Sequence, residues 1–134
     1  MIPATPSPEV KGSGVNEVSF AEFKKIDLRV ARVLDVQDIP GADRIWKLLI
    51  DVGTEKKEIV AGVKEFYTRE QLLGKSVIVV NNLLPNVIRG VESRGMLLAA
   101  SSIKKAEPSV GGKDEKRLSI LILEQDLPPG SLVG

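Results

Sequence analysis

The sequence predicts an all-β fold: a five-stranded barrel with one short helix between strands 3 and 4, followed by a C-terminal strand or turn extension. Three observations predict it. Apolar residues, most of them Val, Ile and Leu, alternate with polar residues over short segments, as in half-buried strands. Turn residues separate these segments, and only two short places have helix-capping spacing. The 134 residues, 43% of them hydrophobic, suffice for one domain with one modest core.

The N-terminal segment, residues 1–17, predicts a flexible arm, and the folded domain is expected over residues 18–134. Three prolines and two glycines fall within residues 1–14, which show hardly any apolar periodicity. The segment lacks the basic start and the apolar core of a secretory signal. No apolar stretch approaches the roughly 20 residues that cross a bilayer. We therefore expect no membrane contact and a cytoplasmic location.

A short helix and a long strand are expected at the start of the domain. Ser19 is a suitable helix N-cap, and Glu22 stands three residues later, which is the spacing of a capping box. In Leu28–Val36 the apolar positions 28, 30, 34 and 36 would share one face, and Arg32 breaks the series. A long, curved first strand would explain this pattern.

The next two strands are expected to form a hairpin. Pro40–Asp43 has turn composition, and apolar residues then alternate with charged ones in Ile45–Val52. Gly53–Lys56 is a second turn, and it leads into a third apolar segment, Glu58–Ala61.

The predicted helix of the barrel follows the third strand. Thr68 and Gln71 have capping-box spacing, and Gly74 stands where a helix of this length would end. Lys75–Asn82 then reads as a strand that is apolar on both faces, and Gly95–Ala100 is another short apolar segment. Both segments are expected near the centre of the sheet.

The C-terminal third predicts a long hairpin and a closing turn. The polar stretch Ser101–Arg117 leads into apolar Leu118–Leu123, and Asp126–Gly130 has turn composition. This order of elements, with three strands, a short helix and then further strands, is that of the oligonucleotide-binding barrel, or OB-fold. Such a barrel closes on itself and so removes exposed sheet edges. Other small barrels and sandwiches share similar strand counts, so this order alone leaves them open.

Two absences restrict the chemistry. The chain has no cysteine and no histidine, which excludes disulfides, thiolate or imidazole zinc sites and every catalytic triad with an imidazole base. Its carboxylates are scattered, and it has no Gly-rich nucleotide loop. We therefore expect no enzyme activity, no cofactor and no metal. The net charge of +1 points only weakly to nucleic acid, so an RNA site would need cations gathered on one face.

Several short motifs occur in a fixed order over roughly residues 20–134. They are Phe23–Val30, Pro40–Ile45, Ile59–Val63, Asn82–Pro85, Arg89–Ala99 and Asp126–Ser131. Together they resemble the tRNA-binding domain family that occurs at the C-terminus, or as a separate subunit, of methionyl-tRNA synthetases. The most specific of them is the block from Arg89 to Ala99.

The resemblance implies an OB-fold that binds tRNA by shape and without catalysis, in support of a methionyl-tRNA synthetase. The implied partners are tRNA, the catalytic subunit of that synthetase and a second copy of the chain. The family also contains chaperone-like homodimers, so a protein-binding module is the alternative. A barrel that only assembles a multi-protein complex is a third possibility.

Candidate RNA contacts follow from the cations and from the resemblance. Arg32 on the first strand and Arg44 beside the first turn are expected to contact phosphates. Arg89 and Arg94 flank a flexible glycine and could clamp one phosphate together, or they could be ordinary surface charges. For Arg29, an ion pair that packs its stem on the barrel is as reasonable as an RNA contact.

Neutral residues complete the candidate surface. The resemblance marks Asn82, Ser93 and Met96, whose amide, hydroxyl and thioether suit ribose or base contacts. Asn82 could instead cap a loop, and Met96 could fill the core. Lys104 and Lys105 are expected to be peripheral at best.

Trp46 is expected in the core or in a subunit interface and not on a base-stacking platform. It alternates with apolar residues of the second strand. One Trp, one Tyr and three Phe are too few for a ladder of stacked bases. Recognition of folded RNA by shape therefore fits better than readout of a single strand.

Overall fold

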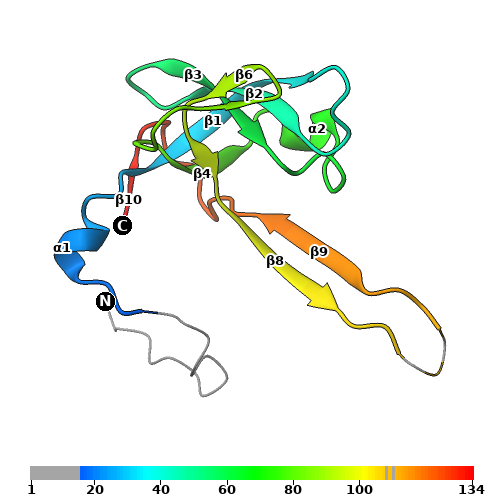
Figure 1. Ribbon diagram of the computed structural model, residues 1–134. Coiled ribbons are helices and arrows are strands. Elements are labelled where there is room, and N and C mark those ends of the chain that lie inside the picture. Colours follow the sequence, from blue (N-terminus) through cyan, green and yellow to red (C-terminus); the bar gives the residue numbers. More distant parts are fainter. Residues whose placement is uncertain (1–15, 108, 110) are drawn as a thin grey trace.

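The computed structural model describes residues 16–107, 109 and 111–134, so most of the predicted arm over residues 1–17 lies outside the described residues. The described chain forms a curled sheet with a long hairpin projecting from it and a short helix at the N-terminal side (Figure 1). No helix in this part of the chain is long and apolar enough to cross a membrane.

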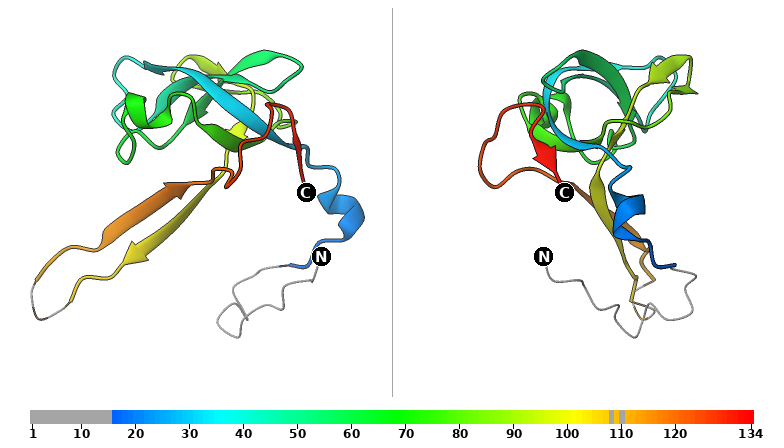
Figure 2. Two further views of the ribbon diagram at one scale, coloured as in Figure 1. Left: turned by 180° about the vertical axis from the view of Figure 1, so that it is seen from behind. Right: turned by 90° about the vertical axis from the view of Figure 1, so that its left-hand side faces the viewer.

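The curled sheet is antiparallel, and its strands lie in the order β3-β2-β1-β4-β7. Their bounds are Leu28–Asp38 for β1, Trp46–Asp51 for β2, Lys56–Ala61 for β3, Ser76–Val80 for β4 and Met96–Leu97 for β7. Seen end-on, the strands bend round into a ring (Figure 2, right). This confirms the all-β prediction and is consistent with a barrel of the oligonucleotide-binding type.

The two ends of the sheet meet where β3, at one end, contacts the segment that precedes β7, at the other end. The N–H group of Val60 donates to Ser93 Oγ at 2.9 Å, and the N–H group of Arg94 donates to Glu58 O at 3.0 Å. These bonds join β3 to the segment that precedes β7, and we call this line the closing seam.

Strand β1 is long because it pairs with both neighbours, with β4 over its first half and with β2 over its second. The register with β2 shifts between Val33 and Asp35, which marks a β-bulge. The bulge moves the inward face from Val33 to Val36, and both are buried. Leu34, which the alternation placed inward, is 38% exposed, so that expectation was wrong.

The core fills the inside of the barrel with branched aliphatic side chains. The fully buried ones include Val33, Leu48, Ile50, Ile59, Val77 and Val79. Helix α2, Arg69–Leu72, covers one end with its buried Leu72. Its capping box uses Thr68 and Gln71, as predicted, and the helix lies between the third and fourth strands of the barrel. Gly74 follows with φ +78°, a conformation that favours glycine.

The segment between β4 and β7 forms a small hairpin that the sequence analysis missed. It consists of β5, Asn86–Ile88, and β6, Val91–Ser93, paired antiparallel. Arg89 and Gly90 form its two-residue turn with φ +52° and +80°. Positive φ at both central residues is the signature of the type I′ turn, which matches the twist of paired strands.

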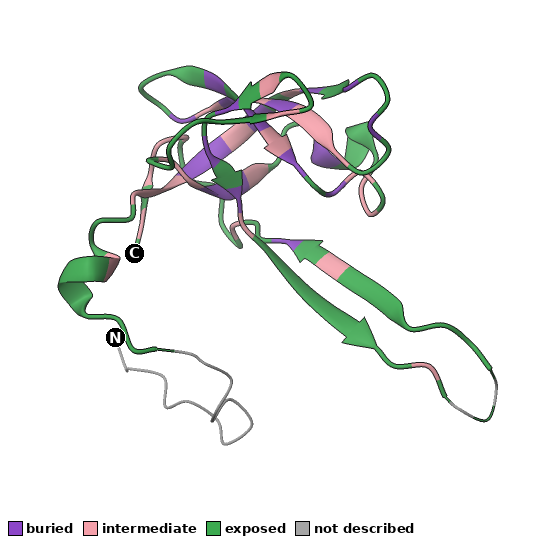
Figure 3. Ribbon diagram, viewed as in Figure 1, coloured by how far each residue is buried: buried purple, intermediate pink, exposed green. Residues whose placement is uncertain are grey.

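The predicted long hairpin is present and extends well away from the barrel (Figures 1 and 2). It consists of β8, Ala99–Lys104, and β9, Glu115–Ile120. We call it the arm. All six residues of β8 are exposed, whereas on β9 Leu118 is half-buried against the core and Ile120 is buried where the strand reaches the barrel (Figure 3). There the Ile120 N–H group donates to the Tyr67 hydroxyl oxygen at 3.1 Å.

Helix α1, Phe20–Phe23, and strand β10, Leu132–Val133, lie on the same side of the barrel (Figure 1). Helix α1 has the predicted capping box of Ser19 and Glu22. Strand β10 pairs with the start of β1, so the C-terminal extension is a strand that follows the predicted turn. The turn crosses the β2–β3 loop so closely that a Cβ on Gly53 would lie 2.7 Å from Pro129 O.

Candidate nucleic-acid interface

A pocket lined by two of the candidate arginines lies between the loop linking β1 to β2 and the tip of the β5–β6 hairpin. Residues 41–45 form one wall, and Ile88 and Arg89 form the other. Its volume is about 330 Å³. It brings Arg44 and Arg89 together, although they are far apart in the sequence. We call it the two-loop pocket.

The β1–β2 loop is held firmly against the barrel. Ile39 and Ala42 are buried, and the Ala42 N–H group donates to Ile39 O at 3.0 Å. The N–H group of Lys64 donates to Arg44 O at 3.3 Å, which fixes the backbone from the other side. The wall that carries Arg44 is therefore largely pre-formed.

Arg89 occupies the opposite wall at the cost of backbone strain. It is the one non-glycine residue with positive φ in the described part of the chain. A left-handed conformation costs an L-residue about 1–2 kcal/mol relative to the right-handed one. No carboxylate forms an ion pair with Arg89 among the described residues. Its guanidinium group is therefore available to an anion.

Arg44 is 84% exposed, and its Nε lies 3.3 Å from Glu65 Oε1. An exposed ion pair of this kind contributes about 0–1 kcal/mol. Because it is so weak, a phosphate entering the two-loop pocket can compete with Glu65 for this arginine.

Arg94 lies at the other end of β6 from Arg89, on the closing seam. Its Nη1 is 3.2 Å from Glu55 Oε1, and its backbone is bonded to Glu58. The structure therefore does not bring Arg89 and Arg94 together as a clamp on one phosphate.

Arg32 is separated from the pocket as well. Its Nη2 lies 3.0 Å from Asp126 Oδ1, which also accepts from the Ser76 hydroxyl group at 3.1 Å. Its Nε is buried and has no partner among the described residues. Of the four candidate arginines, only Arg44 and Arg89 therefore line the two-loop pocket. The C-terminal segment lies where the Arg32 side chain emerges, and its Asp126 pairs with that arginine.

A family comparison shows what kind of domain this chain is. The model of the family described as "Putative tRNA binding domain" matches residues 28–132, most of the chain. The chain belongs to this tRNA-binding domain family. The match includes both walls of the two-loop pocket.

Relatives and solved structures agree with the assignment. The methionine–tRNA ligase of Thermococcus kodakarensis is 39% identical over 123 residues, which cover 92% of this chain and only 15% of that ligase. The crystal structure of a MetRS-related protein from Pyrococcus horikoshii is similar with a TM-score of 0.73 and 30% identity, covering 90% of this chain and all of the other. The CsaA chaperone protein from Picrophilus torridus follows with a TM-score of 0.70, 25% identity and coverage of 88% and 100%.

The neutral candidates of this tRNA-binding domain have different surroundings. Ser93 is 4% exposed, and its hydroxyl group accepts from Val60 and donates to Gly95 O at 3.1 Å. Its hydroxyl group holds the closing seam, which does not favour the predicted direct contact with RNA. Met96 is 45% exposed, so the core-filling alternative is wrong and the side chain is accessible.

Asn82 fastens the segment between α1 and β1. Its Oδ1 accepts from the Asp27 N–H group at 2.8 Å, and its Nδ2 donates to Lys25 O at 2.6 Å. Arg29 pairs with Asp27 at 2.8 Å, so the ion-pair alternative holds for it. These residues organise the N-terminal end of the barrel, away from the residues that line the two-loop pocket.

A buried charge lies at this end of the barrel. Lys57 is buried and donates to Asn81 O at 2.8 Å, and burial lowers the pKa of its ammonium group. The pKa of Asp27 also lies below its usual value, first because Asn81 donates to its carboxylate and then because Arg29 is bonded to it. Partners within the chain already hold these groups, so the network is structural.

Trp46 lies at the edge of the core, which agrees with the first of the two expected places. It packs against the core, and its indole N–H group donates to Tyr67 O at 2.8 Å. One ring face lies under the Lys64 ammonium group at 4.7 Å from the ring centroid. Sequence reasoning missed Lys64, because a single lysine between β3 and α2 gives no signal of these contacts.

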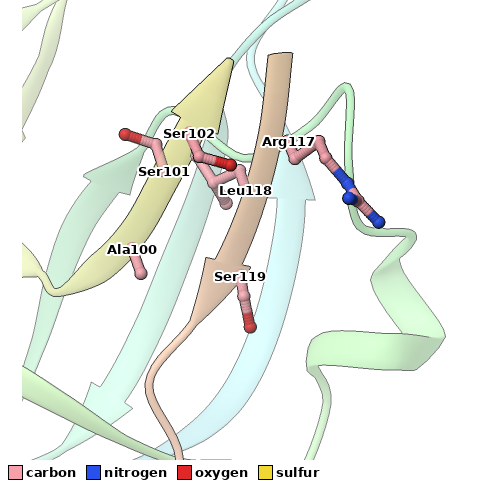
Figure 4. A pocket seen from close by; sticks show the side chains of 6 residues that line it. All are labelled: Ala100, Ser101, Ser102, Arg117, Leu118 and Ser119. Atoms are coloured by element: carbon pink, nitrogen blue, oxygen red, sulfur yellow. The ribbon is translucent and has the colours of Figure 1, made fainter. Parts of the chain in front are cut away.

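The arm has a shallow groove of its own, of about 320 Å³, where it leaves the barrel (Figure 4). Ser102 of β8 stands directly opposite Arg117 of β9. Lys105, further out, pairs with Asp114 at 3.3 Å. No three carboxylate side chains of the described residues come together as metal ligands.

Proposed function

We propose that this domain binds tRNA through the two-loop pocket, without catalysis, and delivers it to a methionyl-tRNA synthetase. The observation that carries the proposal is the pocket that Arg44 and Arg89 line together. In barrels of the oligonucleotide-binding type, the corresponding loops, between strands 1 and 2 and between strands 4 and 5, bind oligonucleotides. The matched family is a binding domain, and this chain spans 15% of the ligase it resembles.

The chemistry of the pocket suits a phosphate on folded RNA. An arginine presents parallel N–H donors that fit two phosphate oxygens, and two arginines on opposite walls can hold one phosphate or two successive ones. The pocket wall offers no aromatic side chain on which a base could stack. Phosphate contacts position an RNA without reading its sequence, so binding would depend on tRNA shape.

A titration with unfractionated tRNA at two or more salt concentrations tests the proposal. Arg89→Ala should weaken binding by about tenfold and reduce the slope of log affinity against log salt by about one. Arg117→Ala is the matched control, because this exposed arginine lies on the arm. Equal affinities for wild type and Arg89→Ala at every salt concentration would refute the pocket as the RNA site.

We also propose that the domain acts as a homodimer in the cytoplasm, as a separate subunit beside the synthetase. The arm supports a dimer: two-stranded sheets are marginally stable alone, and residues 99–103 form a free strand edge without a single charge. A second copy would cover that edge. The mass in solution tests this, and Ser101→Lys should yield monomers if the edge is the contact.

The chaperone-like alternative is motivated by exposed apolar side chains, such as Leu84, Val87 and Ile103, and by the likeness to the CsaA protein. It would require binding of unfolded protein clients with little affinity for tRNA. An assay of aggregation of an unfolded client, run beside the tRNA titration, separates the two functions.

A further inference from the structure

Lys64 contacts the β1–β2 loop at several points, and the proposed function gives this lysine no role. Its Nζ forms an ion pair with Asp38, the last residue of β1, and donates to Ala42 O within the loop at 3.3 Å. The same ammonium group lies over the ring of Trp46, the first residue of β2. One side chain thus contacts the two ends and the middle of the loop.

The backbone of Lys64 adds a fourth connection. Its N–H group donates to the carbonyl oxygen of Arg44, the residue that lines the two-loop pocket. A lysine has three N–H donors and no acceptor, which suits the carboxylate, the carbonyl oxygen and the π-face around it. Only 23% of the Lys64 side chain is exposed, so its contacts with Ala42 O and with the Trp46 ring are partly shielded from water. The Asp38 side chain is 71% exposed, so the ion pair itself remains open to solvent and to salt.

We propose that Lys64 is a positioning residue for the RNA site: it fixes the β1–β2 loop so that Arg44 faces Arg89 across the pocket. This inference rests on the proposed function. Without the ammonium group, Asp38 and Ala42 lose a common partner, and the loop gains freedom that tRNA binding must then remove. Pre-formed sites bind more tightly because less ordering remains to be done on association.

Direct contact between Lys64 and phosphate is a competing role that the geometry disfavours. Lys64 does not line the two-loop pocket, and its ammonium group is already paired with Asp38. A phosphate would have to displace that carboxylate. The two roles differ in whether the effect of Lys64 depends on Arg44.

A double-mutant cycle on the whole chain decides between them. The tRNA dissociation constants are measured for the wild type, Lys64→Gln, Arg44→Ala and the double variant. Positioning through Arg44 predicts that Lys64→Gln weakens binding severalfold, and that the double variant binds no more weakly than Arg44→Ala. Multiplicative losses would overturn the proposal, and so would a Lys64→Gln variant with wild-type affinity.

Two further variants protect the result against a folding defect. Lys64→Arg keeps the charge and should restore most of the affinity, and Asp38→Asn should reproduce the coupling to Arg44 without altering Lys64. The emission of the only tryptophan should shift in free Lys64→Gln, because the cation leaves its ring. If Arg44→Ala and Arg89→Ala both bind like the wild type, the proposed function fails, whereas independent losses with an intact Arg89 effect sink only the positioning role.

Discussion

Arg89 keeps a backbone conformation that glycine would adopt without strain. Backbone strain persists where the surrounding structure imposes it, and it often accompanies function. Arg44, across the pocket, is not strained, but it shares its charge with Glu65. The two arginines therefore suggest separate experiments, one on the backbone and one on the neighbouring carboxylate.

Arg89→Gly should separate stability from binding. Glycine relieves the left-handed strain, although it also gives the unfolded chain more freedom, so the free energy of unfolding should rise by up to about 1 kcal/mol. The affinity for tRNA should nevertheless fall as in Arg89→Ala. Denaturant unfolding and tRNA titration check the two quantities, and a variant that is less stable yet binds normally would contradict both parts.

Glu65→Gln should increase the affinity for tRNA. The change removes a carboxylate that competes with phosphate for Arg44, so we expect a gain of about two- to fivefold at low salt that fades as salt rises. Glu70→Gln on α2 is the control, because this acidic residue forms no ion pair in the described structure. Equal gains from both variants would indicate only a general loss of negative charge.

At the scale of elements, local signals in the sequence were sufficient where a structure forms from neighbouring residues. The capping boxes of α1 and α2 and the turns between strands were predicted because their hydrogen bonds join residues three apart. The β5–β6 hairpin was missed because its strands have three residues each and its turn is Arg-Gly, outside the usual Asn-Gly signal.

The site was only partly predictable, and for a different reason. The candidate arginines were recognised individually, but their grouping depends on partners 21 to 94 residues away, such as Glu65 for Arg44 and Asp126 for Arg32. The bulge in β1 and the covering C-terminal segment also decide which side chains emerge together. No local pattern encodes these relations.

The crossing of the C-terminal turn over the β2–β3 loop predicts a severe effect of Gly53→Ala. The new Cβ would lie 2.7 Å from Pro129 O, at φ +90°, so the turn must move away. We expect a loss of roughly 2–4 kcal/mol in the free energy of unfolding. Gly74→Ala has a similar φ of +78° and open space around it, so it should lose only the left-handed penalty of about 1 kcal/mol. Equal losses would show that the crossing is not tight in solution.

At the scale of the whole molecule, stability should depend on pH through the network at the N-terminal end of the barrel. The folded pKa of Asp27 lies below its value of 3.8 in the unfolded chain, so the unfolded chain binds the proton more readily. Stability should therefore fall as pH falls through 3.8. For Lys57 the folded pKa lies below 10.5, so stability should rise with pH in the alkaline window beneath that value.

Asp27→Asn should flatten the acid limb of this profile. Denaturant unfolding between about pH 5 and about pH 3 measures its slope, and the variant should show a shallower one than the wild type even if its overall stability is lower. Glu92→Gln, on the exposed part of β6, serves as the control. An unchanged slope in Asp27→Asn would assign acid sensitivity to other carboxylates.

The closing seam is held by far fewer hydrogen bonds than the β1–β2 and β1–β4 ladders. One of its two bonds is accepted by the hydroxyl oxygen of Ser93 and not by a backbone carbonyl, and the adjacent strand β7 has only two residues. The closing seam should open locally at a lower free energy than the β1–β2 and β1–β4 ladders, because fewer hydrogen bonds must break at once. Amide hydrogen exchange would then be fastest along the barrel at Val60 and Arg94. If the barrel opens along this line, the β5–β6 hairpin would move relative to β3, and Arg89 in its turn would move with it.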